Sequence, residues 1–600
     1  MRRLILLFCV LALFVSLVGC YGEGTATAEP SVISTEETTE IPAEETTTEA
    51  SDEVAESSGA PTEEETEAPT QENTTEQTEE TTEAALTEED TTNPTEEDTT
   101  APLEETTDVT TETTEEQTDE VIESCADHVD VDNNGLCDEC EITVVVVIDI
   151  FAVNDLHGKI CDSPAQPGVD EMTTYINTAR QNNDHVIVLS SGDMWQGSSE
   201  SNLTRGLIVT EWMNYLDFDS MTIGNHEYDW GEEFIEANAE IAEFPFLAIN
   251  IYDNDTRERA DYCTPSVMVE RGGATIGIIG AIGNCYSSIS KEFSGGVHFK
   301  VGNELTELVK AEALRLREAG ADFIIYSIHG GYAQATSGIT QVADGQISGY
   351  YNTVLSDGYV DLVFEGHTHY GYVLRDSKGV YHLQNGGDNR GISYAEAVVN
   401  FANGENSIRE ARYIYSSEYS SLKDDPIVDE LLAKYNEQVS EGSRVLGNNR
   451  YRRGDSELRQ LVAQLYLEAG IEAFGDEYDI VLGGGFISIR SPKYLPAGEV
   501  TFSQVQGLFP FENTLVLCSV KGSDLLRSFI NTNNDNYFVS YSNYGNSVKG
   551  SINPNATYYI ITDTYCSTYA PNRLIEVKRY TAGVYAQQLL AKYIQSGGLE

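Results

Sequence analysis

Five short polar segments between residues 155 and 369 concentrate the side chains that bind metal ions. Five of the nine histidines of the chain lie within these segments, together with Asp and Asn residues. Imidazole, carboxylate and amide groups suit divalent manganese, zinc, iron or cobalt. The pattern therefore predicts two metal ions held side by side, as in metal-dependent hydrolases. The segments are Asp155-Leu156-His157, Gly192-Asp193, Gly224-Asn225-His226-Glu227, His329-Gly330 and Gly366-His367-Thr368-His369.

The ligand types suggest how these residues divide between two ions. Asp155 and His157 alternate around Leu156, so both can face one ion while Leu156 faces the core. Asp193 follows Gly192 in a predicted tight turn, and its two carboxylate oxygens can each take one ion. The ligands expected to complete the sets are His369 for the first ion and Asn225, His329 and His367 for the second.

Apolar runs precede the polar segments and predict the strands that position them. Helical patterns at 203–215 and 304–319 lie between such runs, the second with Asn303 as its expected N-cap. Polar residues at the ends of strands are placed as in the active site of an α/β sheet. The sequence therefore predicts an α/β fold. The predicted strands are residues 142–153, 185–189, 323–328 and 361–364.

The extended motifs resemble those of a known family. Asn154 precedes the first segment, Met-Trp-Gln-Gly-Ser198 follows Asp193, and Tyr-Asp229 follows Glu227. With this order and spacing, residues 145–600 resemble the calcineurin-like metallophosphoesterases and are most similar to the 5'-nucleotidase family. That family includes UDP-sugar hydrolases and 2',3'-cyclic-nucleotide phosphodiesterases. The resemblance implies a four-layer metallophosphoesterase β-sandwich flanked by helices, plus a C-terminal α/β 5'-nucleotidase domain.

The resemblance also implies a mechanism. His226 is then not a ligand but lies over the transferring phosphoryl group, is oriented by Asp229 and can protonate the leaving oxygen. A hydroxide activated by both ions attacks phosphorus in line. The expected reaction is extracellular hydrolysis of nucleotide phosphate esters, from 5'-nucleotide to nucleoside and phosphate. The alternatives are a cyclic-nucleotide phosphodiesterase or UDP-sugar hydrolase with the same centre, and a surface adhesin with an incidental enzyme fold.

A second α/β pattern, with a predicted helix at 457–469, carries the expected substrate-binding residues. Its glycine run at 483–485 is by itself a weak phosphate-loop signal, because no Walker lysine or dinucleotide fingerprint accompanies it. By the resemblance, Arg490 binds the anionic or ribose part of the substrate. Phe511 then stacks on the base, with Asn513 beside it, although a core aromatic is the alternative for Phe511.

Two departures from the family pattern concern substrate choice. The glycine run of the family usually reaches its arginine sooner than it does here. Many members also carry Gly-Gly-Asp-Gly-Tyr where this chain has Thr562-Asp563-Thr564-Tyr565-Cys566-Ser567-Thr568-Tyr569. The expected opposite wall of the base site is therefore Tyr565 or Tyr569, with a purely structural role as the alternative for either.

The N-terminal residues predict export followed by a spacer. Arg2 and Arg3, the apolar run 4–18 and Gly19 before Cys20 resemble the signal peptide and lipobox of a bacterial lipoprotein, so Cys20 is expected to carry lipid at the cell surface. A plain secretory signal or a short membrane helix is the alternative. Residues 21–124 contain 35 acidic residues and no Lys or Arg. Such a composition predicts an extended, disordered spacer.

The remaining charge constrains the partners of the protein. Residues 1–20 carry a charge of +2 and residues 21–124 a charge of −35, so residues 125–600 carry −33 of the total of −66. A body this acidic argues against binding a nucleic-acid polymer, which needs a basic surface. The expected partners are a nucleotide substrate and, through Cys20, the membrane.

A small cysteine-rich module precedes the predicted enzyme. Cys125-x2-His128 and Cys137-x2-Cys140 could close a tetrahedral zinc site. The interleaved run from Asp130 to Gly135 resembles the start of a calcium loop, and a disulfide-stapled or solvated stretch is the third possibility. The predicted domains are 1–20 signal, 21–124 spacer, 125–141 module, 142–423 catalytic domain, 424–442 linker helix and 443–600 nucleotide-binding domain.

Overall fold

The computed structural model describes residues 144–163, 166–331, 359–376, 378–527, 536–540, 543–544, 552–569, 573–580 and 584–600. The predicted signal with Cys20, the acidic spacer, and the module of Cys125, His128, Cys137 and Cys140 lie outside these residues. Within the described ranges, no helix is both long enough and apolar enough to cross a membrane.

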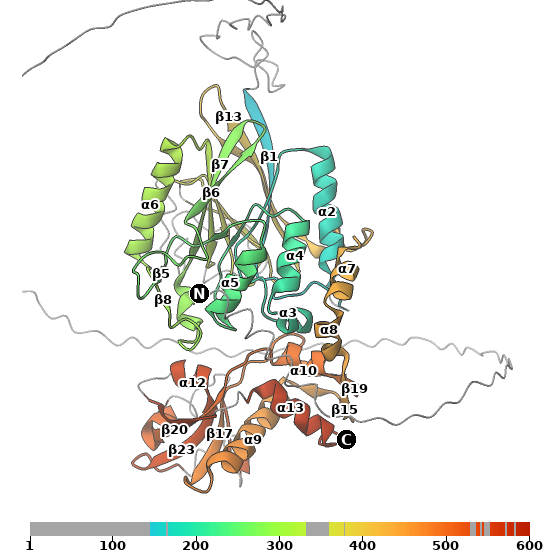
Figure 1. Ribbon diagram of the computed structural model, residues 1–600, viewed down its shortest axis with the longest axis vertical. Coiled ribbons are helices and arrows are strands. Elements are labelled where there is room, and N and C mark those ends of the chain that lie inside the picture. Colours follow the sequence, from blue (N-terminus) through green and yellow to red (C-terminus); the bar gives the residue numbers. More distant parts are fainter. Residues whose placement is uncertain are drawn as a thin grey trace, which may run out of the picture. The chain divides into compact units, whose positions relative to one another are not determined.

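Two sheets pack face to face in the first part of the chain (Figure 1). The space between them is filled by alternate residues of their strands, such as Ile148 and Ile150 from β1 and Ile276 and Ile278 from β7. Because successive side chains of a strand point to opposite faces, the other set contacts the helices outside. In order across the first sheet, the strands are β14 (Ser407–Tyr415), β13 (Gly391–Asn400), β1 (Val145–Val153), β2 (Val186–Ser190), β3 (Ser220–Thr222) and β4 (Phe246–Leu247). In the second sheet they are β11 (Tyr372–Arg375), β12 (Tyr381–Gln384), β10 (Leu362–Glu365), β9 (Phe323–His329), β7 (Ala274–Ile282) and β6 (Ser266–Arg271).

Helices cover both outer faces of this sandwich. Residues of α2, α4, α5 and α7 form one apolar cluster with the first sheet, and residues of α6 form another with the second sheet. Figure 1 shows α6 on one side and α2, α4 and α7 on the other. The predicted four-layer α/β sandwich is therefore confirmed. The helices are α2 (Val169–Asn182), α3 (Ser199–Thr204), α4 (Leu207–Tyr215), α5 (Glu232–Ile241), α6 (Asn303–Glu318) and α7 (Ile427–Lys434).

Two helix predictions were wrong in detail. The pattern at 203–215 is broken, because Arg205 and Gly206 adopt left-handed backbone conformations with φ of 53° and 85°. A Cβ on Gly206 would lie 2.7 Å from the Trp195 ring, so the close approach of this indole requires glycine. The N-cap of α6 is Gly302 rather than Asn303, which is the first helical residue.

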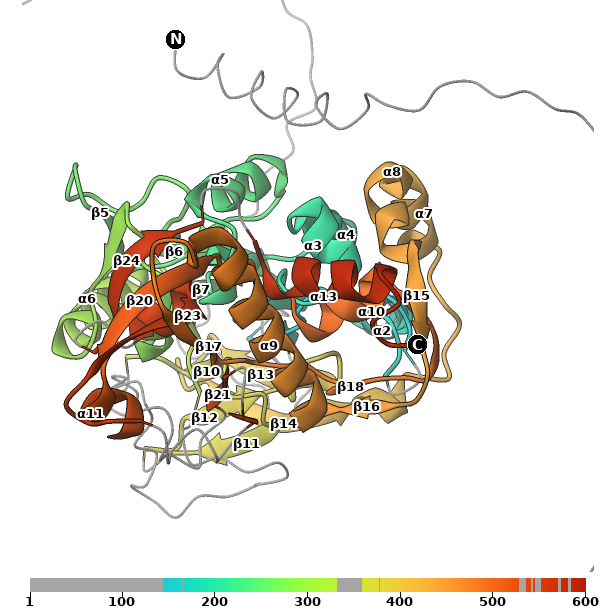
Figure 2. The same ribbon diagram turned by 90° about the horizontal axis from the view of Figure 1, so that it is seen from below.

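The C-terminal part contains a third sheet, which packs against helix α9 (Asp455–Phe474) (Figure 2). The predicted helix 457–469 is the longer α9, and the predicted linker helix 424–442 is divided into α7, α8 and a 3-10 turn. The glycine run belongs to strand β17 rather than to a phosphate loop. A Cβ on Gly483 would lie 2.5 Å from the backbone nitrogen of Leu467, so glycine lets α9 approach the sheet.

The bounds of these C-terminal elements complete the described fold. In sheet order the strands are β22 (Asn543–Tyr544), β21 (Asn536–Ser540), β17 (Ile480–Phe486), β23 (Thr557–Asp563), β20 (Leu515–Lys521) and β24 (Ile575–Arg579). Three two-stranded sheets pair β5 (Ile251–Asp253) with β8 (Val297–Phe299), β15 (Val445–Asn449) with β19 (Gly498–Thr501), and β16 (Arg453–Gly454) with β18 (Tyr494–Leu495). The helices are α8 (Asn436–Val439), α9 (Asp455–Phe474), α10 (Phe502–Leu508), α11 (Gly522–Leu525), α12 (Thr564–Tyr569) and α13 (Ala586–Gln595).

Candidate active site

The five polar segments meet at one end of the sandwich. Strands β1, β2 and β3 run parallel in the first sheet, and β9 and β10 run parallel in the second. Because the carboxyl ends of parallel strands lie at the same edge, both sheets deliver their segments to one place. The first two segments are joined directly, since the backbone N–H of Asp155 donates to Gly192 O (2.8 Å) and that of His157 to Asp193 O (3.1 Å).

The backbone at this edge is strained. Five of the seven predicted metal ligands have positive φ, a conformation that is uncommon outside glycine and that clusters at functional sites. They are Asp155 (51°), His157 (51°), Asp193 (56°), His367 (79°) and His369 (58°).

One group of donors contains Asp155, His157 and His369. The Nε2 atoms of the two histidines lie 3.0 Å apart, and His369 Nε2 lies 3.2 Å from Asp155 Oδ1. The Nδ1 of His157 lies 2.7 Å from the carbonyl oxygen of Gln196. This contact turns Nε2 toward the other donors, as outer carbonyls do for metal-binding imidazoles.

A second group contains Asn225, His329 and His367. Oδ1 of Asn225 lies 2.9 Å from His367 Nδ1 and 3.2 Å from His329 Nε2. Asp193 joins this group, because its Oδ2 lies 3.0 Å from His329 Nε2. The carbonyl of Ser191 holds the other ring nitrogen of His329 at 2.7 Å.

The charges of the cluster fit divalent metal ions. Among the described residues, no Lys or Arg forms an ion pair with the buried carboxylates of Asp155 or Asp193. Burial alone would raise the pKa of both carboxyls, but neighbouring histidines hold them below the usual range. Burial would lower the pKa of His329, yet Asp193 raises it to about 9. A metal ion would supply the positive charge that His329 otherwise carries as a proton.

The imidazoles are suited to binding such ions. Burial lowers the pKa of His157 well below its usual value and that of His367 to about 4. Both rings are therefore neutral, with a nitrogen lone pair available, as metal ligation requires.

His226 lies beside both groups without belonging to either set of predicted ligands. Its Nδ1 lies 2.7 Å from Asp229 Oδ2, and its Nε2 accepts a hydrogen bond from Arg490 Nη2 at 2.8 Å. Burial would lower the pKa of His226, but Asp229 and Asp193 outweigh that effect and raise it. The ring is thus an oriented imidazole whose protonated form is favoured by these two carboxylates.

A cavity of about 210 Å³ connects this cluster with the C-terminal part. Arg490 and Phe511 both lie against His226. Arg490 donates to its Nε2, and the Phe511 ring centroid lies 5.8 Å from that of His226. The Arg490 guanidinium also lies 5.2 Å from the Phe511 centroid. Two hydroxyl-bearing residues, Ser288 and Ser290, also line this cavity. All four predicted substrate residues, Arg490, Phe511, Asn513 and Tyr565, line the cavity together with Asn225, His226, Asp229 and His367.

Two regions of the chain match known families. Residues 148–371 match the calcineurin-like phosphoesterases, and residues 436–570 match the C-terminal domain of 5'-nucleotidases.

The chain belongs to the 5'-nucleotidase family of calcineurin-like phosphoesterases.

Named relatives agree with this membership. The apyrase of Tabanus yao is 26% identical over 422 residues, which cover 64% of this chain and 72% of the apyrase. Protein UshA of Yersinia enterocolitica is 26% identical over 426 residues, covering 63% of this chain and 74% of UshA. The structure of a 5'-nucleotidase precursor from Thermus thermophilus shares the fold, with a TM-score of 0.58 at 18% identity, over 75% of this chain and 96% of that one. This member of the 5'-nucleotidase family is therefore a metallophosphoesterase, and its relatives support hydrolysis of nucleotide phosphate esters.

One residue of this 5'-nucleotidase-family site was present in a motif but received no predicted role. Glu227 is fully buried, and its carboxylate accepts the backbone N–H groups of Gly224 (2.7 Å), Asp193 (2.9 Å) and Met194 (2.8 Å). Glu227 therefore joins the loop of Asp193 to the loop of Asn225 through these hydrogen bonds. The only sequence signal was its position directly after His226.

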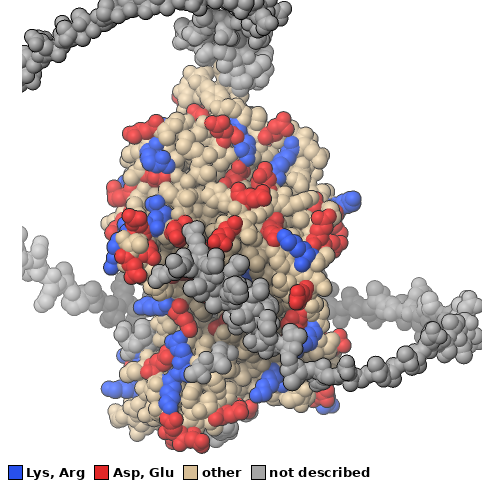
Figure 3. All heavy atoms as spheres, in the orientation of Figure 1, with Lys and Arg blue, Asp and Glu red and all other residues tan. Residues whose placement is uncertain are grey.

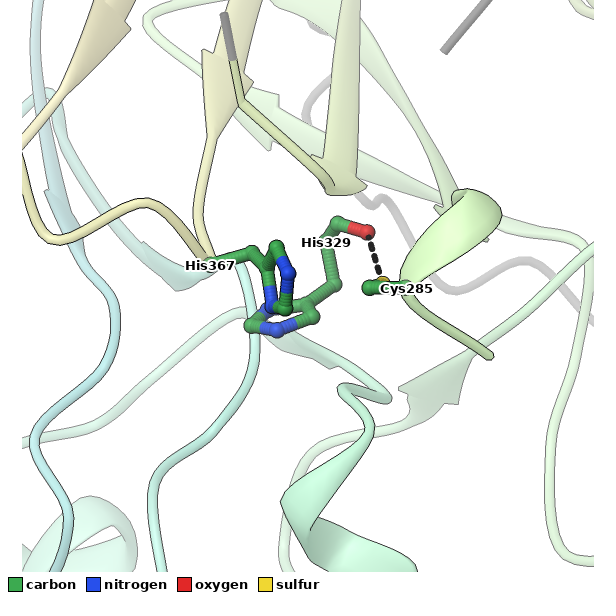
Figure 4. A group of neighbouring side chains, drawn as sticks. All are labelled: Cys285, His329 and His367. Atoms are coloured by element: carbon green, nitrogen blue, oxygen red, sulfur yellow. Dashed lines mark hydrogen bonds between the residues drawn. The ribbon is translucent and has the colours of Figure 1, made fainter. Parts of the chain in front are cut away.

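Two further residues of the site were not predicted. Asp563 lines the cavity, and burial raises its pKa to about 6. Cys285 lies beside His329 and His367 in Figure 4, on a segment for which no chemical role was predicted. The cysteines at 161, 263, 285, 518 and 566 are all free thiols.

The charged surface also bears on the partners of this enzyme. On the face drawn in Figure 3, Asp and Glu side chains are interspersed with Lys and Arg. The described part of that face therefore carries no continuous basic surface of the kind that binds a nucleic-acid polymer.

Proposed function

We propose that this protein hydrolyses nucleoside 5'-monophosphates to nucleoside and phosphate at a two-metal centre. The observation that supports this most directly is the cavity that is lined both by the predicted metal ligands Asn225 and His367 with His226 and by Phe511, Asn513 and Tyr565. A phosphate ester attached to a nucleoside would need both kinds of group, metal ligands for its anionic part and aromatic side chains for its base.

The residues of the chain have distinct roles in this proposal. Phe511 and Tyr565 hold the base between aromatic faces, each stacked base being worth about 1–3 kcal/mol. Arg490 donates to a phosphoryl oxygen, which releases Nε2 of His226. The freed Nε2 of His226 can then take up a proton from solvent, because Asp229 and Asp193 raise the pKa of the ring. Fixed through Nδ1 by Asp229 (2.7 Å), His226 donates this proton to the leaving oxygen of the ester.

The seven predicted ligands would hold the ions. Asp155, His157 and His369 would hold one ion, Asn225, His329 and His367 would hold the other, and Asp193 would serve both. Two divalent ions there would activate a water molecule as nucleophile and neutralise the charge that gathers on the phosphoryl oxygens. Their oxygen and nitrogen donors suit manganese, zinc, iron or cobalt.

A larger substrate is the second candidate, because another cavity adjoins the first. This cavity of about 480 Å³ shares Ser288, Ser290 and Tyr565 with it and is also lined by Lys291 and His298. Its hydroxyl groups and single lysine suit the sugar and second phosphate of a nucleotide sugar. We therefore retain UDP-sugar hydrolysis as the alternative and rank cyclic diesters below it.

We further propose that the enzyme acts outside the cell. The apolar N-terminal run ending at Cys20 supports a lipid anchor, and residues 21–124 would hold residues 142–600 away from the membrane. Metal analysis of a peptide spanning 121–142 tests the zinc or calcium site at Cys125, His128, Cys137 and Cys140, and a metal-free peptide would refute both ions.

Phosphate release tests the proposed reaction. The metal-stripped enzyme is assayed with a panel of 5'-nucleotides, cyclic nucleotides and UDP-glucose, before and after each metal is added back. Asp193→Asn should lower kcat by about 100- to 1,000-fold or more, whereas Asp524→Asn, which removes a carboxylate paired with Arg527 (2.9 Å), should leave it unchanged. Full activity of the stripped enzyme or of Asp193→Asn would refute the reaction proposed.

A further inference from the structure

A buried thiol lies next to the second group of predicted ligands. Cys285 belongs to the 3-10 turn Asn284–Ser288 that follows β7. Strand β7 pairs with β9 in parallel, with Ile282 opposite His329. The fold therefore places the turn after β7 beside the ligand at the end of β9, and Cys285 is only 4% exposed.

The sulfur and two imidazoles form a compact cluster. The Sγ of Cys285 and ring nitrogens of His329 and His367 all lie within 4.8 Å of one another, and Figure 4 shows the three side chains converging from separate segments. Neighbouring ligand atoms of one zinc ion lie about 3–3.6 Å apart at bonds of about 2.0–2.3 Å, whether four or five ligands surround the ion. A contraction of about an ångström would bring the cluster to that spacing.

We propose that Cys285 is a further protein ligand of the ion held by His329 and His367, and that it biases this position toward zinc or cobalt over manganese. The proposal rests on the two-metal centre proposed above. Thiolates prefer soft and borderline ions, whereas manganese prefers oxygen donors. The other donors predicted for this ion are imidazole nitrogens and the oxygens of Asn225 and Asp193, so one sulfur would change its preference.

The local hydrogen bonds allow this role. In the described structure the thiol donates to the backbone oxygen of His329 at 3.0 Å, the contact drawn in Figure 4. On metal binding, the S–H bond breaks, the proton passes to solvent, and the sulfur electron pair forms the bond to the ion. The same carbonyl also accepts the N–H of Gly283 at 2.9 Å, so it keeps a donor after the thiol proton has left.

Cobalt spectroscopy of the full-length enzyme tests the proposal independently of catalysis. Every protein in this test carries Cys125→Ser, Cys137→Ser and Cys140→Ser, because the module proposed there would itself give a sulfur-to-cobalt band, and the protein unchanged at Cys285 is called the wild type. Cobalt bound to nitrogen and oxygen donors gives visible ligand-field bands, and only a sulfur ligand adds a sulfur-to-cobalt charge-transfer band in the near ultraviolet. The wild type should show both. Cys285→Ser should lose the charge-transfer band, keep the ligand-field bands, and bind its second zinc about 100-fold more weakly. Manganese affinity should change by less than about 3-fold.

A matched control is another buried thiol of the same region. Cys263 is 7% exposed, and its thiol donates to the carbonyl oxygens of Ala248 and Ala260, at 3.6 and 3.5 Å. Cys263→Ser should retain the charge-transfer band. Cys285→Ala, checked for folding by thermal melting, should reproduce the spectrum of Cys285→Ser.

The outcomes separate this proposal from the proposed function. Phosphate release with ligand-field bands but no charge-transfer band in the wild type would overturn the role of Cys285 alone. A charge-transfer band that persists in Cys285→Ser would do the same. A charge-transfer band in an enzyme that releases phosphate from no nucleotide would overturn the function alone, and an enzyme that binds no cobalt would overturn both.

Discussion

Replacing Glu227 by glutamine should weaken metal binding although Glu227 is not a predicted ligand. In the structure, Oε2 accepts the N–H groups of Asp193 and Gly224, and Oε1 accepts that of Met194. Glutamine keeps one oxygen, so its best orientation preserves two of these bonds and turns an NH₂ group toward the third N–H. The loop of Asp193 must then shift to relieve two facing donors.

The size of the effect follows from these contacts. A buried donor without an acceptor costs about 1–3 kcal/mol, so the two facing donors cost about 2–6 kcal/mol together. The pKa of Glu227 is raised to about 7 by burial and by the Asp193 carboxylate, which means that a neutral glutamine relieves repulsion in the metal-free protein. Bound ions neutralise Asp193 and remove that compensation. The destabilisation should therefore appear chiefly in the metal-loaded enzyme.

Calorimetric titration and thermal melting measure both consequences. The affinity for zinc or manganese should fall about 10- to 100-fold, and the rise in Tm on metal loading should shrink by about 5–15 °C, at about 2–4 °C per kcal/mol. Glu312→Gln is the matched control, since Glu312 is a buried carboxylate that pairs with Arg315 (2.7 Å) away from the site. Unchanged metal affinity and an unchanged metal-induced rise in Tm in Glu227→Gln would refute the reasoning.

Three further predictions concern charge, metal and substrate. Burial raises the pKa of Asp563 to about 6, so the protonated form is favoured in the folded protein and stability is lost as pH rises through that value. Asp563→Asn should therefore raise Tm at pH 8 and leave it nearly unchanged below about pH 4, and an equal shift at both would contradict this origin. Chelation should lower Tm as well as abolish phosphate release, because Asp155 and Asp193 then face each other without a divalent counter-charge; a melting curve indifferent to chelator would count against the metal centre. Phe511→Leu should raise KM for nucleotides about 5- to 100-fold through lost stacking but leave KM for p-nitrophenyl phosphate unchanged, and equal losses for both substrates would argue against base binding.

The sequence by itself determined the parts of this protein that depend on local patterns. Buried strands ending in polar residues predicted the α/β fold. Apolar strands must be covered on both faces of their sheet, and the polar residues that follow each strand begin the loops at the edge of that sheet. The spacing of His226 and Asp229 likewise placed them within one turn of chain, where they form their 2.7 Å contact. Such relationships need only a few consecutive residues.

Tertiary structure decided everything that joins distant segments. His157 meets His369 across 212 residues, and Arg490 reaches His226 across 264 residues, which only the pairing of whole strands and domains can arrange. The break of the helix at Gly206 follows from contact with Trp195, and the roles of Glu227 and Cys285 follow from the neighbours that packing gives them. Composition cannot report such contacts, because a buried carboxylate or thiol has the same sequence signature whether it faces a core or a metal ligand.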